Sequence, residues 1–196
     1  MARPDLILAS ASPRRKELLG LLRLTFEVVP SAYEEVLPEE HPDPAALAVH
    51  LAAEKALDVS RRRPGELVLG ADTVVALGPR IYGKPTGPAD ARRMLRELSG
   101  KTHEVITGVA LVRTHGDTPQ TKTLAARTEV RFRELDDPEI DEYLDTGEPF
   151  DKAGAYGIQG YGALLIEGIR GDYPNVVGLP VAPLALLLRA EGLNKK

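Results

Sequence analysis

Short apolar runs that suit buried strands alternate along this chain with runs that have the spacing of amphipathic helices, and this alternation limits the possible folds more than any other feature. Strands are predicted at 6–9, 26–29, 66–77, 103–113, 121–133 and 163–166. Helices are predicted at 13–22, 44–61, 88–98, 136–146 and 180–188. The turn-rich HGDTPQ between the two longest strands predicts a hairpin. The chain is therefore expected to have a mixed α/β fold.

The chain has 196 residues, of which 43% are hydrophobic, so it can bury one sizeable core as one large domain or two small lobes. It contains no internal repeat, low-complexity segment or long polar linker that would mark a domain boundary. The acidic, proline-containing segment from Tyr33 to Pro44 is expected to be an exposed loop. DKAGAYGIQGYG, residues 151–162, is expected to be a glycine-rich loop that leads into the strand at 163–166.

Charge and composition exclude several classes of function. The net charge of −4 argues against a broad nucleic-acid-binding surface, because affinity for a phosphate backbone needs massed lysines and arginines. The absence of cysteine excludes disulfides, thiolate metal sites and cysteine nucleophiles. No run approaches the roughly 18 apolar residues that span a bilayer, and the first residues lack a signal-peptide pattern. A cytoplasmic protein that does not bind a membrane is expected.

The stretch LILASASPRRKELL places two arginines where a helix normally prefers acids. Ser12 suits the N-cap and Pro13 the first helical position. Arg14 and Arg15 then face the positive end of the helix dipole, at a cost of roughly 0.3–1 kcal/mol per charge. Together with Ser10 they form a junction of hydroxyls, helix N–H groups and guanidinium groups that suits a phosphate, with Arg15 expected to contact ligand and not core. The alternative is a capping serine with two solvated arginines.

Two other stretches carry polar residues in apolar or constrained surroundings. Asp72 and Thr73 interrupt the apolar strand 66–77, and a carboxylate in that place needs a partner, a metal ion or a catalytic role. A loop-end aspartate is the simpler alternative. Lys84 lies in GKP, where glycine and proline either bring the backbone close to a ligand or only make a turn.

The glycine-rich loop carries Asp151, Lys152 and Gln159, and its four glycines permit close backbone approaches. Two nearby matches to nucleotide-binding motifs are false. SGKTH lacks the first glycine of a P-loop, because Leu95 stands there, and GIQGYG is not GxGxxG and does not open a helix. The histidines show no metal-ligand spacing and no partner nucleophile, so they are expected to be surface or core residues; they are His41, His50, His103 and His115.

Eight motifs in order cover nearly the whole chain and resemble the Maf family of nucleotide pyrophosphatases. They are LILASASPRRKELL, the acidic pair Glu34–Glu35, AAEKA, GADTVV, GKP, SGKTHEVITGVAL, DKAGAYGIQG and GDYPNVVGLP. AYGIQG resembles the branch that acts on dTTP and UTP, whereas the branch acting on 7-methyl-GTP carries an acid at the place of Gln159. The resemblance implies a single domain over residues 1–196 with a fold related to the inosine triphosphate pyrophosphatases: an elongated mixed sheet, flanking helices and two lobes around a central cleft.

The resemblance also implies a chemistry: hydrolysis of a nucleoside triphosphate between the α- and β-phosphates, with Mg²⁺ or Mn²⁺, in a homodimer that cleans the nucleotide pool. It implies that Asp72 is the general base, that Glu35 and Lys84 assist, and that Glu35, Asp72 and Asp151 hold the metal, with the division between base and ligand left open. The residues expected to bind the substrate are Ser10, Ser12, Arg14, Arg15, Lys55, Thr73, Lys152 and Gln159.

The base specificity follows from hydrogen-bond chemistry as well as from the resemblance. Uracil and thymine present a carbonyl acceptor beside an N3–H donor, and the Gln159 amide offers one donor and one acceptor. Thr73 and Arg14 are the other positions at which the resemblance points to specificity. Two alternatives remain: a nucleotide-binding regulator of cell division or septum formation that needs no turnover, and an RNA-binding protein, which the net charge and the nine aromatic residues disfavour.

Overall fold

The structure, a computed structural model, describes residues 4–37, 39–41, 43–115 and 118–193 of the chain. The strands are β1 (Leu6–Leu8), β2 (Phe26–Val28), β3 (Val68–Leu77), β4 (Arg80–Tyr82), β5 (Thr102–His115), β6 (Thr118–Phe132) and β7 (Ile166–Arg170). The α-helices are α1 (Pro13–Gly20), α2 (Pro44–Arg62), α3 (Pro88–Leu98), α4 (Asp137–Asp145), α5 (Tyr173–Val177) and α6 (Val181–Ala190). Short 3₁₀ helices are η1 (Glu148–Asp151), η2 (Ala153–Ala155) and η3 (Gly160–Leu165). The predicted mixed α/β class is confirmed.

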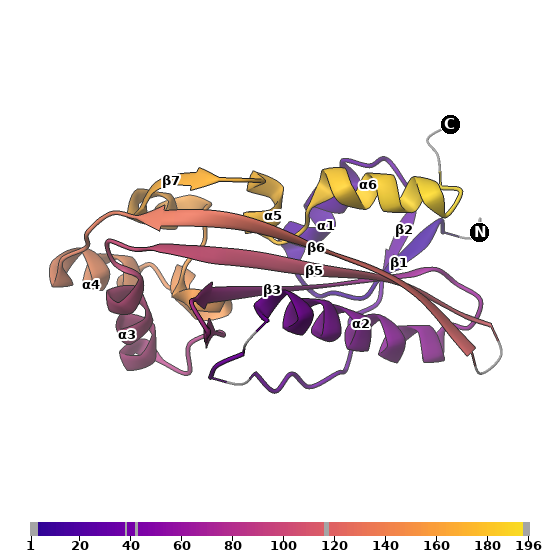
Figure 1. The fold of residues 1–196 in the computed structure, drawn as a ribbon, viewed down its shortest axis with the longest axis horizontal. Coiled ribbons are helices and arrows are strands. Elements are labelled where there is room, and N and C mark those ends of the chain that lie inside the picture. Colours follow the sequence, from indigo (N-terminus) through magenta and orange to yellow (C-terminus); the bar gives the residue numbers. More distant parts are fainter. Residues whose placement is uncertain (1–3, 38, 42, 116–117, 194–196) are drawn as a thin grey trace.

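The described strands form one seven-stranded sheet in the order β2-β1-β3-β5-β6-β7, with β4 added beside β3. β1 runs parallel to β2 and β3, and the other neighbouring strands are antiparallel. The predicted hairpin is confirmed as β5 and β6, although residues 116–117 of its turn lie outside the described residues. Its strands of 14 and 15 residues extend about 45–50 Å at roughly 3.3 Å per residue, which makes the molecule elongated (Figure 1).

Helix α2 covers one face of the sheet, while α1 and α6 lie on the other face (Figure 1). Two glycines let α2 approach β3 and β5 closely. A Cβ at Gly70 would lie 2.1 Å from the Ala52 carbonyl oxygen, and one at Gly108 would lie 2.2 Å from the backbone of Ala48. No side chain fits in either place, so the glycines allow α2 to bring Lys55 against the sheet.

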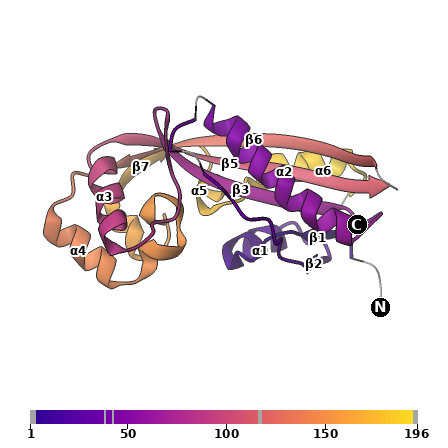
Figure 2. The ribbon, with the colours of Figure 1, turned by 90° about the horizontal axis from the view of Figure 1, so that it is seen from below.

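The core has different parts at the two ends of the sheet. At one end the leucines of β1, α1 and α6 pack together. The helices α3 and α4 lie at the other end (Figure 2), where the buried cluster includes Tyr82, Phe132 and Tyr156. These ends form the two lobes that the family resemblance implies. Within the described residues, no helix has both the length and the apolar character needed to cross a bilayer.

The strand predicted at 163–166 is wrong. Residues 160–165 form the 3₁₀ helix η3, and the strand β7 begins only at Ile166. The Glu148 carboxylate accepts the N–H groups of Tyr161 and Gly162 at 3.2 and 3.3 Å, so these donors are satisfied by a side chain and not by a neighbouring strand. β4 and α5 were not predicted, because RIY is not an apolar run and YPNVV shows no helical periodicity.

Candidate active site

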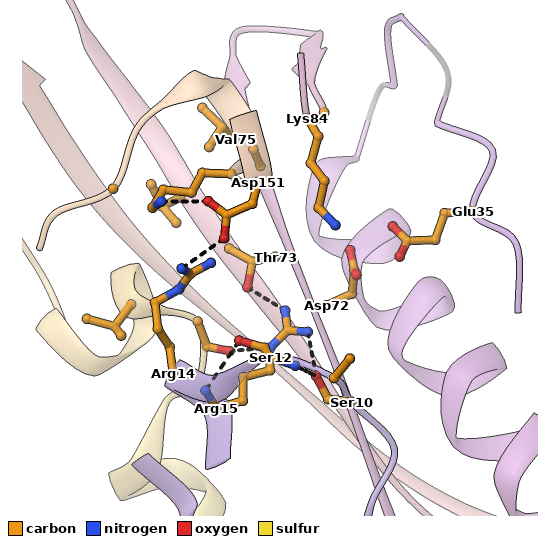
Figure 3. Close-up of a pocket in the computed structure, with 18 of the residues that line it drawn as sticks. Ser10, Ser12, Arg14, Arg15, Glu35, Asp72, Thr73, Val75, Lys84 and Asp151 are labelled. Carbon is orange, nitrogen blue, oxygen red and sulfur yellow. Dashed lines mark hydrogen bonds and ion pairs between the residues drawn. The ribbon is translucent and has the colours of Figure 1, made fainter. Parts of the chain in front are cut away.

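A cavity of about 750 Å³ lies where the two lobes meet, a size within the usual range of small-molecule sites (Figure 3). Every residue predicted to belong to the site lines it: Ser10, Ser12, Arg14, Arg15, Glu35, Lys55, Asp72, Thr73, Lys84, Asp151, Lys152 and Gln159. These residues come from six separate segments of the chain, so the fold brings together what the sequence distributes over 150 positions.

The cavity lies beside an uncovered part of one strand edge. β5 pairs with one edge of β3 along almost its whole length, but on the other edge β1 pairs only as far as Leu69 and β4 only from Val75. Asp72 and Thr73 lie in the interval. Successive side chains of a strand point to opposite faces, yet both of these reach the cavity because no described strand covers the edge between them and the α1 junction.

The start of α1 has the predicted capping geometry. The Ser12 hydroxyl accepts the N–H of Arg15 at 3.4 Å, Pro13 occupies the first helical turn, and the Ser12 N–H donates to the Ser10 hydroxyl at 3.2 Å. The two arginines are therefore presented from a fixed first turn. Both line the cavity, and the alternative of a solvated arginine on an exposed face is wrong for Arg15, which is hydrogen-bonded to Gly178 and Thr73.

Arg15 is bonded to the protein as well as facing the cavity. Its Nε donates to the carbonyl of Gly178 at 2.9 Å, Nη2 to the hydroxyl of Thr73 at 3.1 Å and Nη1 to Ser10 at 3.4 Å (Figure 3). Burial lowers the pKa of the guanidinium, which nonetheless remains charged. Contact of Arg15 with a ligand and not with the core stays a prediction, and the structure adds that three protein acceptors hold the side chain.

Arg14 behaves differently from its neighbour. Its side chain is 32% exposed and its Nη1 forms an ion pair with Asp151 at 3.2 Å, whose carboxylate is 64% exposed. Asp151 also accepts from the Lys152 ammonium at 2.6 Å. Burial alone would raise the pKa of Asp151, but the hydrogen bond and charge of Lys152 outweigh it, and the pKa is lowered. This carboxylate is thus an ionised partner of two cations.

Asp72 is a buried carboxylate beside three charges. It is 5% exposed, in the middle of β3 and not at a strand end, and it forms an ion pair with Lys55 from α2. The same Lys55 ammonium contacts Glu35 at 2.5 Å. Burial raises the pKa of Asp72, with Glu35 acting in the same direction, while the charges of Lys55 and Arg15 oppose the rise. A carboxylate whose pKa is raised toward the working pH is suited to accept a proton.

The donor set fits a magnesium-type cation through two carboxylates. Glu35 and Asp72 both reach one cation, the Lys55 ammonium, so they converge on a single position. Mg²⁺ commonly uses one or two carboxylates and completes its shell with water and phosphate oxygens. Over the described ranges, no three Asp, Glu or His side chains form a metal-binding group, and Asp151 is paired with Arg14 and Lys152 instead.

The other wall of the cavity consists of loops. Lys152 donates to the carbonyl of Glu148 at 2.6 Å, and the Gly154 N–H donates to the carbonyl of Gly83 at 3.0 Å, which joins the glycine-rich loop to the GKP turn. Gly154 has φ of +69°, a conformation that favours glycine. In Figure 3 the exposed Lys84 side chain extends from the GKP turn toward Asp72 and Glu35.

Comparison with known proteins adds to this geometry. The Maf-like protein family matches residues 5–191. The chain belongs to the Maf family. Among its curated relatives, the dTTP/UTP pyrophosphatase of Gloeobacter violaceus is 53% identical over 186 residues, 95% of each chain. The dTTP/UTP pyrophosphatase of Anaeromyxobacter dehalogenans is 52% identical over 190 residues, 96% of this chain and 95% of the relative.

Sequence reasoning missed several residues of the Maf cavity, among them Tyr156 and Gly178. Tyr156 is 5% exposed, and its hydroxyl is 2.7 Å from Nε2 of the buried His103, whose ring also stacks edge-on with Phe132. Burial lowers the pKa of His103 to about 4, so it is a neutral core histidine, one of the two roles expected. The only available signal was the family motifs AYGIQG and GDYPNVVGLP, which contain these residues without giving them roles.

Proposed function

We propose that this Maf protein is a nucleoside triphosphate pyrophosphatase that hydrolyses dTTP and UTP to the monophosphate and pyrophosphate, and thereby cleans the nucleotide pool. The observation that carries the proposal is the buried Asp72 between Lys55 and Arg15 at the wall of a cavity lined by further cations. A site that only binds an anion gains nothing from a buried carboxylate. Relatives about half identical over nearly their full length are named dTTP/UTP pyrophosphatase.

The cationic side chains account for binding of a triphosphate. Arg14 and Arg15 approach from the first turn of α1, and the ammonium groups come from three other segments: Lys55, Lys84 and Lys152. A triphosphate carries nearly four negative charges, and charge-assisted hydrogen bonds to phosphate oxygens are about twice as strong as neutral ones. Arg15 is held in place before the ligand arrives, so little side-chain entropy is lost on binding.

In this proposal Asp72 acts as the general base. Its carboxylate accepts a proton from a water molecule as the water oxygen attacks the α-phosphorus. The bond between the α-phosphorus and the bridging oxygen then breaks, and pyrophosphate leaves with that electron pair. The charges of Lys55 and Arg15 oppose the rise in the pKa of the buried Asp72 and so favour its carboxylate form, and Lys84 faces the same region to stabilise charge on the phosphoryl oxygens.

Glu35 and Asp72 are the residues that would hold Mg²⁺ or Mn²⁺, and Asp151 remains a predicted ligand that is paired with cations in this structure. When bound, the metal supplies neutralisation of phosphate charge. In this structure both carboxylates form ion pairs with Lys55. Its long flexible side chain can pair with phosphate oxygens of the substrate instead, which would leave the carboxylates available for the metal.

Base recognition is assigned to the loop wall. Gln159 is exposed and lines the cavity, so its amide is available for the carbonyl and N3–H of a pyrimidine.

We propose further that the protein is a cytoplasmic homodimer. In support of the dimer, large apolar side chains are exposed on η3, where Tyr161 is 62% and Leu164 67% exposed, and at the start of α5, where Tyr173 is 45% exposed. Sedimentation velocity distinguishes the dimer from a monomer.

The decisive experiment is a product analysis over a nucleotide panel. The purified protein with Mg²⁺ or Mn²⁺ is expected to convert dTTP and UTP to monophosphate and pyrophosphate in preference to CTP, GTP and 7-methyl-GTP, and to be inactive after chelation. Release of orthophosphate with a diphosphate product overturns attack at the α-phosphorus. Tight binding of dTTP with no product supports the non-catalytic regulator instead.

A further inference from the structure

A continuous row of polar groups runs away from the cavity beneath Arg15. The Arg15 Nη2 donates to the Thr73 hydroxyl at 3.1 Å, and the Thr73 and Thr107 hydroxyls are 2.9 Å apart. Thr107 then donates to the main-chain carbonyl of Asn175 at 3.0 Å. Thr73 and Thr107 are direct partners in the register of β3 and β5, so their side chains lie side by side on one face of the sheet.

The direction of every bond in this row is fixed by chemistry. A guanidinium is only a donor, and a carbonyl is only an acceptor. Thr107 donates its single hydroxyl hydrogen to the Asn175 carbonyl, so it can only accept a hydrogen bond from the Thr73 hydroxyl. Thr73 in turn accepts one from Arg15. Thr73 therefore has no proton left for a ligand, which makes it a support for Arg15 and not a donor to a nucleotide base.

The far end of the row is anchored in the sheet. Asn175 is fully buried, and its Nδ2 donates to the carbonyl of Val105 at 3.0 Å and to the hydroxyl of Thr128 at 2.9 Å. Thr128 also accepts the N–H of Asp172 at 3.0 Å. These bonds fix the segment 172–178 against β5 and β6, and the same segment supplies the Gly178 carbonyl that accepts from Arg15.

We propose that Thr107 is a positioning residue for Arg15: the row from Thr73 to Asn175 sets the orientation of the guanidinium, so that its free N–H groups meet the triphosphate. The proposal rests on the proposed function, since it assigns a phosphate-binding role to Arg15. Within the described residues, three of the five N–H groups of Arg15 have protein acceptors, and one on each terminal nitrogen remains for the ligand. Thr107 itself is fully buried and is absent from the cavity wall.

The test uses a matched pair of threonines on one strand. Thr107 and Thr114 both lie in β5, are 0% and 8% exposed, and each is hydrogen-bonded to another hydroxyl, Thr114 to that of Ser60 at 2.7 Å. Thr107→Val and Thr114→Val thus both remove one buried hydroxyl with little change of shape. Thr107→Ser retains the hydroxyl and serves as the rescue variant. KM and kcat for dTTP and the thermal midpoint of unfolding are measured for all three.

We expect Thr107→Val to raise KM for dTTP about five- to twenty-fold, the loss that follows from weakening one charge-assisted contact, with kcat changed less than about threefold. Thr107→Ser is expected to restore KM, and Thr114→Val to leave it unchanged despite a similar loss of thermal stability. Equal KM values for the two valine variants, or a serine variant as impaired as the valine variant, overturn the proposal. If Thr107→Val does not fold, Thr107→Cys takes its place with the same expected outcomes. A wild-type protein without pyrophosphatase activity refutes the proposed function separately.

Discussion

The two walls of the cavity are built in different ways. On the sheet wall, Asp72 is 5% exposed, and its neighbour Thr73 is connected through hydrogen bonds to the buried Thr107 and to α5. On the loop wall, Asp151 is 64% exposed and Gln159 is exposed, and the bonds that order the loop run to nearby carbonyls and charges. The sheet wall is thus part of the core, whereas the loop wall is attached to it.

This difference explains how such a site can separate chemistry from selection of the base. Groups that transfer protons or orient phosphates need fixed positions, and β3 provides them through its pairing with β5. Groups that select the base need only complementary donors and acceptors, and a loop can present these without support from the core. Substitutions on the sheet wall should therefore affect turnover, binding and stability, whereas those on the loop wall should affect the choice of substrate.

The largest expected effect belongs to the sheet wall. Asp72→Asn retains the shape but cannot take a proton, so kcat for dTTP should fall by about 10²–10⁴, the usual contribution of a general base, while KM stays similar or falls. Steady-state kinetics measure both values. The control is Asp137→Asn, which removes a carboxylate that pairs with Arg96 on the surface of α4. If Asp72→Asn retains activity within a few-fold, Glu35 becomes the candidate for the base.

A comparison of the two adjacent arginines tests the boundary between the walls. Both Arg14→Ala and Arg15→Ala should raise KM for dTTP roughly tenfold, since each removes a cation from the phosphate site. Arg15→Ala should also lower the free energy of unfolding by about 1.5–3 kcal/mol, because it leaves the Gly178 carbonyl without its charged donor. Arg14→Ala should cost less than about 1 kcal/mol, as expected for an exposed ion pair. Urea unfolding measures the difference, and equal losses of stability would show that both arginines belong to the same wall.

The smallest effect on stability is expected on the loop wall. Gln159→Glu keeps the size of the side chain but removes its donors, so the O4 carbonyl of a pyrimidine would face a carboxylate. Such a mismatch costs roughly 1–3 kcal/mol, which reduces the preference for dTTP and UTP over GTP about ten- to a hundred-fold. The free energy of unfolding should not change. The measurement is kcat/KM for dTTP, UTP, CTP, GTP and 7-methyl-GTP, normalised to the best substrate of each protein. An unchanged ranking would remove Gln159 from base recognition.

Much of the fold could be predicted from the sequence because local patterns determine it. Helix α3 has the predicted bounds, Ser12 caps the helix that it was expected to cap, and the long hairpin follows from two apolar runs around a turn. The segment at 160–165 could not be predicted in this way. Its N–H groups are satisfied by the distant Glu148 carboxylate, so apolar residues that suit a strand form a 3₁₀ helix.

The sequence by itself also identified the charged residues that line the cavity, because the family motifs and the unusual charges identify chemistry wherever they occur. Only the tertiary structure decided what each one does there. Arg14 and Arg15 are adjacent and chemically identical, yet one pairs with an exposed carboxylate 137 positions away and the other is fixed by a carbonyl 163 positions away. Burial and long-range hydrogen bonds depend on how β3, α1 and α5 pack together, and no local pattern in the sequence contains that information.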